Sequence, residues 1–389
     1  MDIPVSPVPA GRIRPGPAIT HGQRTSSLDT ADAGPVGAWT VSLGAAISTA
    51  GLSWDVEWHR DVGPDTFFTL PHLALYSGSA LAGIASLVMV LLSTSAQRAG
   101  RPVPRWVGGT PVRVFGGIFT APLGYLVSGI GAASFLLYGL LDLGWHSIYG
   151  FDAVLSTPSH VALFLSISIT LIGTVMIFAA AREQRWGRIG VVFAMPILML
   201  FAPLPVNALN NLTLPINPVV IGIVFFSPLL LLIGAGVLQR RGAAVAIAVT
   251  LGALQTGLWW FSPWAAKTYA ASVGLPLRDG LIPQPPKLPS AAPMFLIVAA
   301  VAVEILFWMS RTRGLDARKM MLLAGVVTGL IVGLTLPVQQ SLTDPTSPLS
   351  STDVVILGLL GIPLGGLAGF LAARFTVMLH ALAPARKEL

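Results

Sequence analysis

Residues 158–181 read PSHVALFLSISITLIGTVMIFAAA and contain no Asp, Glu, Lys or Arg. A helix needs about 20 consecutive apolar residues to cross the hydrocarbon core of a membrane. This stretch meets that requirement, and further runs of the same kind follow one another along the chain. They cover residues 37–59, 71–95, 121–145, 188–206, 218–239, 242–262, 293–310, 320–338 and 354–379. The sequence therefore predicts an all-α, polytopic helical membrane protein with about ten transmembrane helices.

The composition of the chain supports this class of protein. Hydrophobic residues make up 54% of its 389 residues and charged residues only 10%, and the mean hydropathy is +0.77. Soluble domains typically carry about 25% charged residues. The net charge of +7 does not indicate nucleic acid as a partner, because the basic residues gather in alternate loops between apolar runs. We expect membrane lipid to be the partner instead.

The distribution of basic residues predicts the orientation of the chain. Of the 23 Lys and Arg residues, the expected outer segments hold only Arg60, Lys267, Arg278 and Lys287. Under the positive-inside rule, this bias places both termini in the cytoplasm and predicts a multi-pass protein of the inner membrane. Residues 106–120 are then expected to lie at the cytoplasmic face as an interfacial or re-entrant segment, because another crossing would invert every later loop.

Three regions follow from the pattern of spans. Residues 1–35 are rich in Pro, Gly, Ser and Thr, which predicts a disordered cytoplasmic tail. Residues 36–186 hold the first four spans, and residues 187–389 hold six spans of unassigned role. The chain has no cysteine, which excludes disulfides and thiolate metal ligands.

A polar motif occurs twice in the first four spans, 87 residues apart. Residues 54–75 read WDVEWHRDVGPDTFFTLPHLAL, and residues 141–163 read LDLGWHSIYGFDAVLSTPSHVAL. The two copies align without a gap up to Pro71 and Pro158, and Ser159 is then one extra residue before the last histidine. Such a repeat indicates an internal duplication.

Each copy carries one aspartate and two histidines. Asp55 and His59 lie four residues apart and share one face of a helix, while His72 opens the next span. Because the loop between is short, the two spans must be antiparallel neighbours, and the three side chains should meet at the outer edge of the membrane. The second copy repeats the set with Asp142, His146 and His160. One carboxylate and two neutral imidazoles predict a metal site in each copy.

The residue types leave the metal open among Fe(II), Zn(II) and Cu(II). A haem held by two histidines would leave the repeated aspartate unexplained. Asp65 and Asp152, in the two loops, are expected to accept hydrogen bonds from the ligand imidazoles. Because each copy is an outgoing helix, a loop and a returning helix, we expect a pseudo-two-fold axis along the membrane normal.

The spacing Asp-x3-His-x12-His, followed by a second x3-His-x13-His, resembles the C subunit of the copper membrane monooxygenases. That family includes the particulate methane and ammonia monooxygenases. The resemblance implies a copper site at Asp55, His59 and His72. It implies an adjacent site at His146 and His160, where Asp142 stands in place of the family's Asn. It covers residues 36–181 at most, and no family pattern is found over 187–389.

The resemblance implies an oxidase or monooxygenase component that acts on O2 and a small apolar substrate or ammonia at the outer face, with related subunits in a hetero-oligomer. Two alternatives remain open. One is a membrane protein that transports or chaperones copper, although carriers of Cu(I) usually use Met and Cys. The other is a structural subunit with vestigial sites.

Two polar residues stand out in the second half of the chain. Glu304 lies inside the span predicted at 293–310, and Gln255 inside the span at 242–262. Ionisable residues within spans are costly and tend to be functional. Glu304 is therefore a candidate for a proton relay or a ligand-facing group, and the alternative is a carboxyl group that is hydrogen-bonded to a neighbouring helix.

Overall fold

The computed structural model of the protein describes residues 30–63, 66–150, 155–210, 212–282, 284–344, 346 and 349–383. Over these residues the chain is almost entirely α-helical, apart from one short β-hairpin and two 3-10 turns. The first part comprises α1 (Thr30–Asp61), α2 (Leu70–Arg98), β1 (Pro111–Val114), η1 (Phe115–Gly117), β2 (Phe119–Pro122), α3 (Leu123–Tyr149) and α4 (Pro158–Ala180). The second comprises α5 (Arg185–Phe201), η2 (Leu204–Leu209), α6 (Pro218–Leu238), α7 (Ala243–Ser272), α8 (Lys287–Ala291), α9 (Leu296–Arg313), α10 (Ala317–Thr343) and α11 (Ser351–Ala381).

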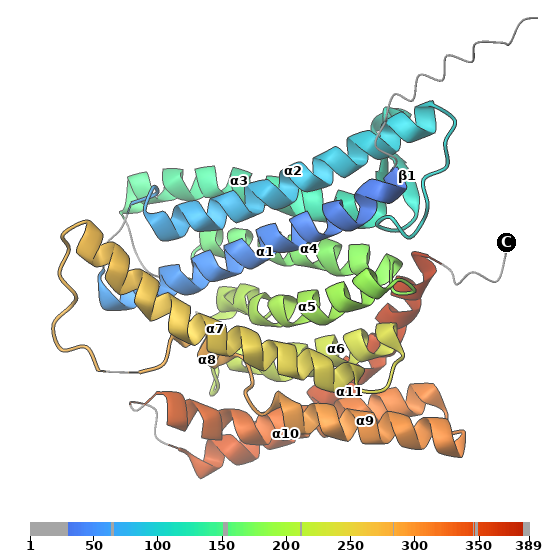
Figure 1. Ribbon diagram of the computed structural model, residues 1–389. Coiled ribbons are helices and arrows are strands. Elements are labelled where there is room, and N and C mark those ends of the chain that lie inside the picture. The colour runs from blue at the N-terminus through green and yellow to red at the C-terminus, as the bar shows by residue number, and fades with distance from the viewer. Residues whose placement is uncertain are drawn as a thin grey trace, which may run out of the picture.

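Nine of the helices in the described part of the chain are long and apolar enough to cross a membrane. They confirm the predicted all-α, polytopic class. The remaining expected span corresponds to α9, which has 18 residues and carries Glu304, Arg311 and Arg313. At 1.5 Å per residue α9 is about 27 Å long, close to the thickness of a hydrocarbon core. It lies beside α10 in the bundle (Figure 1).

Both ends of the described chain lie at the same end of the helical bundle (Figure 1). The hydroxyl group of Tyr125 donates to the carbonyl oxygen of Gly34 near the start of α1, at 3.2 Å. The hydroxyl group of Thr110 donates to the carbonyl oxygen of Leu382 just after α11, at 3.3 Å. Thr110 before α3 and Tyr125 in the first turn of α3 therefore contact the two ends of the chain. This agrees with an even number of chain crossings, the arrangement that the basic loops predict.

Two sequence expectations concern irregular segments at this end of the bundle. Helix α1 begins at Thr30, so residues 30–35 of the expected tail are helical, and residues 1–29 lie outside the described part. Residues 106–120 form no spanning helix. Most of this segment is a hairpin in which Val114 pairs with Phe119, and Thr94 at the end of α2 holds it by accepting from the Thr120 N–H at 2.9 Å.

The duplication extends from the polar motif into the packing of the helices. A Cβ atom added to Gly44 of α1 would lie 2.5 Å from the Gly78 carbonyl oxygen of α2. The same atom on Gly131 of α3 would lie 2.7 Å from the Ser166 carbonyl oxygen of α4. Only glycine permits these close crossings. Because the two helix pairs cross at equivalent residues, each pair brings its outer ends together in the same way.

The second half of the chain packs against these two helix pairs and shares one apolar core with them. Helix α7 lies along α1, where the hydroxyl groups of Ser53 and Ser262 are 2.7 Å apart. Helices α10 and α11 form the closest pair, since a Cβ atom on Gly329 would lie 2.1 Å from the Gly361 carbonyl oxygen. The boundary expected at residue 186 therefore does not separate two cores.

Candidate metal centre

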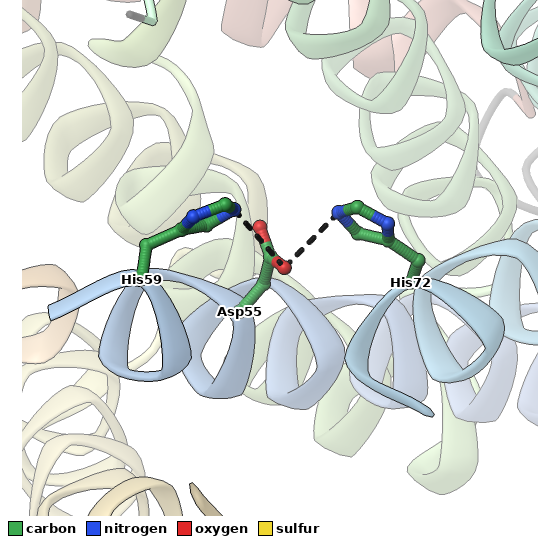
Figure 2. Close-up of side chains that lie close together, drawn as sticks. All are labelled: Asp55, His59 and His72. Atoms are coloured by element: carbon green, nitrogen blue, oxygen red, sulfur yellow. Dashed lines mark ion pairs between the residues drawn. The ribbon is translucent and has the colours of Figure 1, made fainter. Parts of the chain in front are cut away.

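The first triad lies where α1 ends and α2 begins, at the end of the bundle opposite the hairpin. Asp55 and His59 project from the same face of α1, and His72 projects toward them from the first turn of α2 (Figure 2). The Asp55 Oδ1 atom lies 3.9 Å from His59 Nε2 and 3.1 Å from His72 Nε2. Both imidazoles thus turn the same nitrogen toward one carboxylate oxygen.

The second triad repeats this arrangement at the end of α3 and the start of α4. The Asp142 Oδ1 atom lies 3.4 Å from His146 Nε2 and 4.0 Å from His160 Nε2. This set is more deeply buried than the first, since the His146 side chain is 4% exposed and that of His59 is 25% exposed. A bound ion at the second triad would therefore be further from water.

The opposite nitrogen of three of these imidazoles is already engaged. His72 Nδ1 lies 3.1 Å from the Thr66 carbonyl oxygen, and His146 Nδ1 lies 2.9 Å from the Gly150 carbonyl oxygen. A carbonyl oxygen can only accept, so Nδ1 must carry the proton in both rings. In the neutral form of each ring, the Nε2 atom that faces the aspartate then has a free lone pair, which is the state that a metal ligand requires.

His160 is held instead by the side chain of the residue that caps its helix. Its Nδ1 atom lies 2.7 Å from the Thr157 hydroxyl oxygen, and Thr157 is the N-cap of α4. Thr69 is likewise the N-cap of α2 and lies 3.3 Å from His72 Nδ1. A threonine three residues before the histidine is therefore common to both copies, a pattern visible in the sequence that the prediction did not use.

The helix caps also correct the alignment of the two copies. His72 and His160 both occupy the third helical position after their threonine caps, whereas Pro71 is the second helical residue of α2 and Pro158 the first of α4. The extra residue of the second copy therefore lies in the loop before Thr157, and Ser159 is not an insertion. Placing it in the loop keeps both histidines at the same height and angle on their helices.

Both aspartates leave one carboxylate oxygen without a hydrogen bond. Asp55 Oδ1 and Asp142 Oδ1 are buried and accept no hydrogen bond from the described residues, although two imidazole nitrogens lie near each of them. A buried carboxylate oxygen that accepts no hydrogen bond is unfavourable. In each triad the three potential ligand atoms lie within 4.8 Å of one another. Bonds of about 2.0–2.2 Å to a metal would hold them about 3–3.5 Å apart, so small side-chain rotations would suffice.

All six side chains line one cavity of about 360 Å³. Apolar residues of the four helices form the rest of its wall toward the membrane interior: Leu52, Val56, Leu75, Phe135, Leu163, Phe164 and Ile167. Two cations, Arg60 and Lys287, also line the cavity. The two triads thus share one largely apolar chamber.

Neither cation was predicted to belong to the site. Arg60 binds the carboxylate of Glu57, donates from Nε to Asp61 Oδ1 at 2.8 Å, and donates from Nη1 to the Pro285 carbonyl oxygen at 3.2 Å. It therefore joins the end of α1 to the segment that carries Lys287, at the start of α8. No local signal could have found this contact, because more than 200 residues separate Arg60 from Pro285.

The other residues singled out from the sequence lie apart from the triads or beyond the described residues. Asp65 and Asp152 belong to the latter group, so their expected hydrogen bonds remain a prediction. Gln255 is buried and donates from Nε2 to the carbonyl oxygens of Pro289 and Ala292 at 2.9 Å each, which fixes α8 against α7. Glu304 accepts from the Ala244 N–H at 2.9 Å. Glu304 thus caps the first turn of α7. This is a hydrogen bond to a neighbouring helix, which the sequence analysis named as the alternative to a proton relay.

Comparisons with known proteins do not place the chain in a family. It matches no family model, no curated protein and no solved structure. The class of the protein therefore follows from its fold and its site. It is a multi-pass helical membrane protein with two Asp-His-His groups that could each hold a metal ion.

Proposed function

We propose that the protein is an integral-membrane copper protein that carries one copper ion at each Asp-His-His triad, and that it acts as an oxidase or monooxygenase component. The single observation that carries the proposal is the shared cavity, into which both triads turn their potential ligand atoms. Two metal sites in one apolar chamber can act on the same small molecule.

The ligand set supports copper over harder ions. Each triad offers two imidazole nitrogens and one carboxylate, which suit Cu(II), Zn(II) and Fe(II) and do not suit Ca²⁺ or Mg²⁺. Copper ranks above zinc and iron in affinity for such a site, and the spacing of the motif resembles that of the copper membrane monooxygenases. Bound copper would supply one-electron chemistry with O2.

The residues around the triads define what this chain contributes to such chemistry. The Nδ1 contacts of His72, His146 and His160 hold the imidazoles in orientation. The apolar wall excludes water and accepts a neutral, apolar substrate that arrives through the bilayer. A small apolar molecule is therefore the preferred substrate.

The proposal includes orientation and partners. The basic loops favour an inner-membrane protein whose triads open toward the outside. We extend the proposal to partner subunits that deliver electrons, in a hetero-oligomer like that of the family it resembles.

Metal analysis of the purified, detergent-solubilised chain tests the proposal. We expect about two copper ions per chain, with His59→Ala removing the first and His146→Ala the second. Asp142→Asn should lower the occupancy of the second site and leave the first loaded, because a neutral amide holds a divalent ion less tightly than a carboxylate.

The control is His380→Ala, which removes a histidine at the far end of α11 that contacts the Val237 carbonyl oxygen at 3.2 Å. This variant should keep both ions. A His59→Ala, His146→Ala double variant with unchanged copper content would exclude the assignment, and stoichiometric zinc or iron in place of copper would exclude the proposed metal.

A further inference from the structure

A second cavity, at the arginine-rich end of the bundle, lies far from the metal centre along the helices. It has a volume of about 240 Å³ and lies between α5, the end of α6 and the start of α7. Three arginines are among the residues that line it, Arg188, Arg240 and Arg241. Arg188 belongs to the first turn of α5, and Arg240 and Arg241 belong to the loop between α6 and α7, so positive charge from two separate parts of the chain meets at one point between helices.

These charges are not neutralised by ion pairs within the described chain. Arg188 donates from Nη1 to the carbonyl oxygen of Glu183 at 2.7 Å, which orients its guanidinium group without cancelling its charge. The carboxylate of Glu183 lies 3.8 Å from Arg182 instead. The carboxylate of Glu304 caps the backbone of α7. A net positive charge thus remains at the cavity.

An apolar surface continues from the cavity toward the middle of the bundle. Ile189 of α5 lines the cavity, and Phe193 lies one turn further along the same face. Ala246 of α7 lines the opposite side, and Val249 follows it one turn on. Ile189, Phe193 and Val249 are all exposed, and α5 and α7 are packed side by side (Figure 1). The arginines at the end of the bundle match the charged headgroup of a phospholipid, and the apolar side chains further along the helices match its acyl chains.

We infer that this cavity binds the headgroup phosphate of an anionic phospholipid, such as phosphatidylglycerol, with its acyl chains lying along α5 and α7. Basic pockets between transmembrane helices are the usual sites for anionic headgroups. Arginine suits a phosphate because its planar fork of N–H donors matches the phosphate oxygens. A zwitterionic headgroup would bring its own cation against the three arginines. The inference is independent of the metal at the other end of the molecule.

Lipid binding by the full-length chain in detergent tests the inference. Native mass spectrometry would follow titrations with phosphatidylglycerol, phosphatidylcholine and inorganic phosphate. We expect one tightly held phosphatidylglycerol per chain, with phosphatidylcholine and phosphate much weaker. Each basic residue near a membrane surface raises the affinity for an anionic lipid by about tenfold or less. The variant R188Q/R240Q/R241Q should therefore bind phosphatidylglycerol on the order of a hundredfold more weakly.

Two matched variants complete the experiment. R311Q/R313Q removes two arginines from the last turn of α9, outside the cavity, and should bind phosphatidylglycerol as the unaltered chain does. R188K/R240K/R241K keeps the charge and should keep the preference for phosphatidylglycerol over phosphatidylcholine. If the glutamine variant fails to fold, loss of this preference in the lysine variant would contradict the inference. Equal binding of the two lipids by the unaltered chain would overturn the inference. Inorganic phosphate bound as tightly as phosphatidylglycerol would also overturn it.

Discussion

Among the contacts between described residues, the Nδ1 atom of His160 has one oxygen neighbour, whereas that of His72 has two. His160 Nδ1 lies 2.7 Å from the Thr157 hydroxyl oxygen. His72 Nδ1 lies 3.3 Å from the Thr69 hydroxyl oxygen and 3.1 Å from the Thr66 carbonyl oxygen. The two triads therefore have the same potential ligands but different described contacts at the second histidine.

This difference predicts unequal effects for the same substitution in the two copies. Thr157→Val should weaken metal binding at the second triad by roughly 10–100-fold, the usual effect of losing a hydrogen bond to a ligand histidine. Thr69→Val should have a smaller effect at the first triad, because the Thr66 carbonyl oxygen still orients His72. Competition with a chelator, read out by metal content, measures both. Equal losses at the two triads would show that the threonines do not orient the imidazoles.

At the scale of elements, each triad is held together by a close crossing of two helices. Gly131 of α3 faces the backbone of α4, and an added Cβ atom would lie 2.4 Å from the Thr170 nitrogen. Gly144, further along α3, has open space around its Cα atom. The first position cannot accept a methyl group unless the helices separate, whereas the second can.

Gly131→Ala is therefore expected to lower thermal stability, by about 1–3 kcal/mol, the usual cost of overpacking. It should also reduce metal occupancy at the second triad, because α3 and α4 each carry part of it. Gly144→Ala is the control and should be neutral or slightly stabilising, since alanine favours a helix over glycine by about 1 kcal/mol. Thermal unfolding and metal content of both variants provide the measurement. Unchanged stability in Gly131→Ala would mean that the crossing tolerates a wider separation.

A second link between elements is the clamp formed by Arg60. Its guanidinium group binds the carboxylates of Glu57 and Asp61, of which Glu57 is 1% exposed. Its Nη1 atom also donates to the carbonyl oxygens of Gln284 and Pro285. Arg60 thus holds the segment before α8 over the metal cavity, and it balances two acidic groups that would otherwise be buried alone.

Arg60→Gln should destabilise the protein by about 3 kcal/mol, because removing one partner leaves buried carboxylates without a counter-charge. Adding Glu57→Gln should restore part of this loss, since the second change removes one of the stranded charges. Thermal unfolding of the two single variants and the double variant forms the test. If the double variant is less stable than Arg60→Gln alone, the loss comes from the contacts to residues 284 and 285 and not from charge.

At the scale of the whole molecule, the two ends of the bundle have different chemistry. The six potential metal ligands lie at one end, and the pocket of three arginines lies at the other. The second half of the chain has a part in both, because α8 contributes Lys287 to the first cavity and α7 forms one wall of the second. Residues 187–389 therefore complete both cavities.

The orientation of the bundle can be tested by cysteine labelling, because the chain has no native cysteine. We expect an impermeant thiol reagent to label Ile148→Cys and Leu275→Cys in intact cells. It should label Ile118→Cys and Leu315→Cys only after permeabilisation. All four side chains are exposed in the folded protein, so burial does not confuse the result. The opposite pattern would place the metal centre in the cytoplasm and contradict the orientation drawn from the basic loops.

Much of the fold follows from local sequence properties. An uncharged run such as 158–181 must form a helix in a membrane, because no water is available to satisfy its backbone groups. The start of α4 is marked by Thr157 and Pro158, a cap and a proline in the first helical position. The short hairpin at 111–122 was less predictable, since it depends on Thr94 and Gln97 of α2 for its position.

The class of protein and the grouping of each triad could be predicted from the amino-acid sequence, because hydrophobicity is a local property and a spacing of four residues places two side chains on one face of a helix. Three features could be learned only from the tertiary structure: the two triads share one cavity, the extra residue of the second copy lies in a loop, and Arg60 and Lys287 line the cavity. These features depend on how helices distant in sequence pack together. Such packing is set by the fit of many small contacts, such as those at Gly44 and Gly131, which no short motif records.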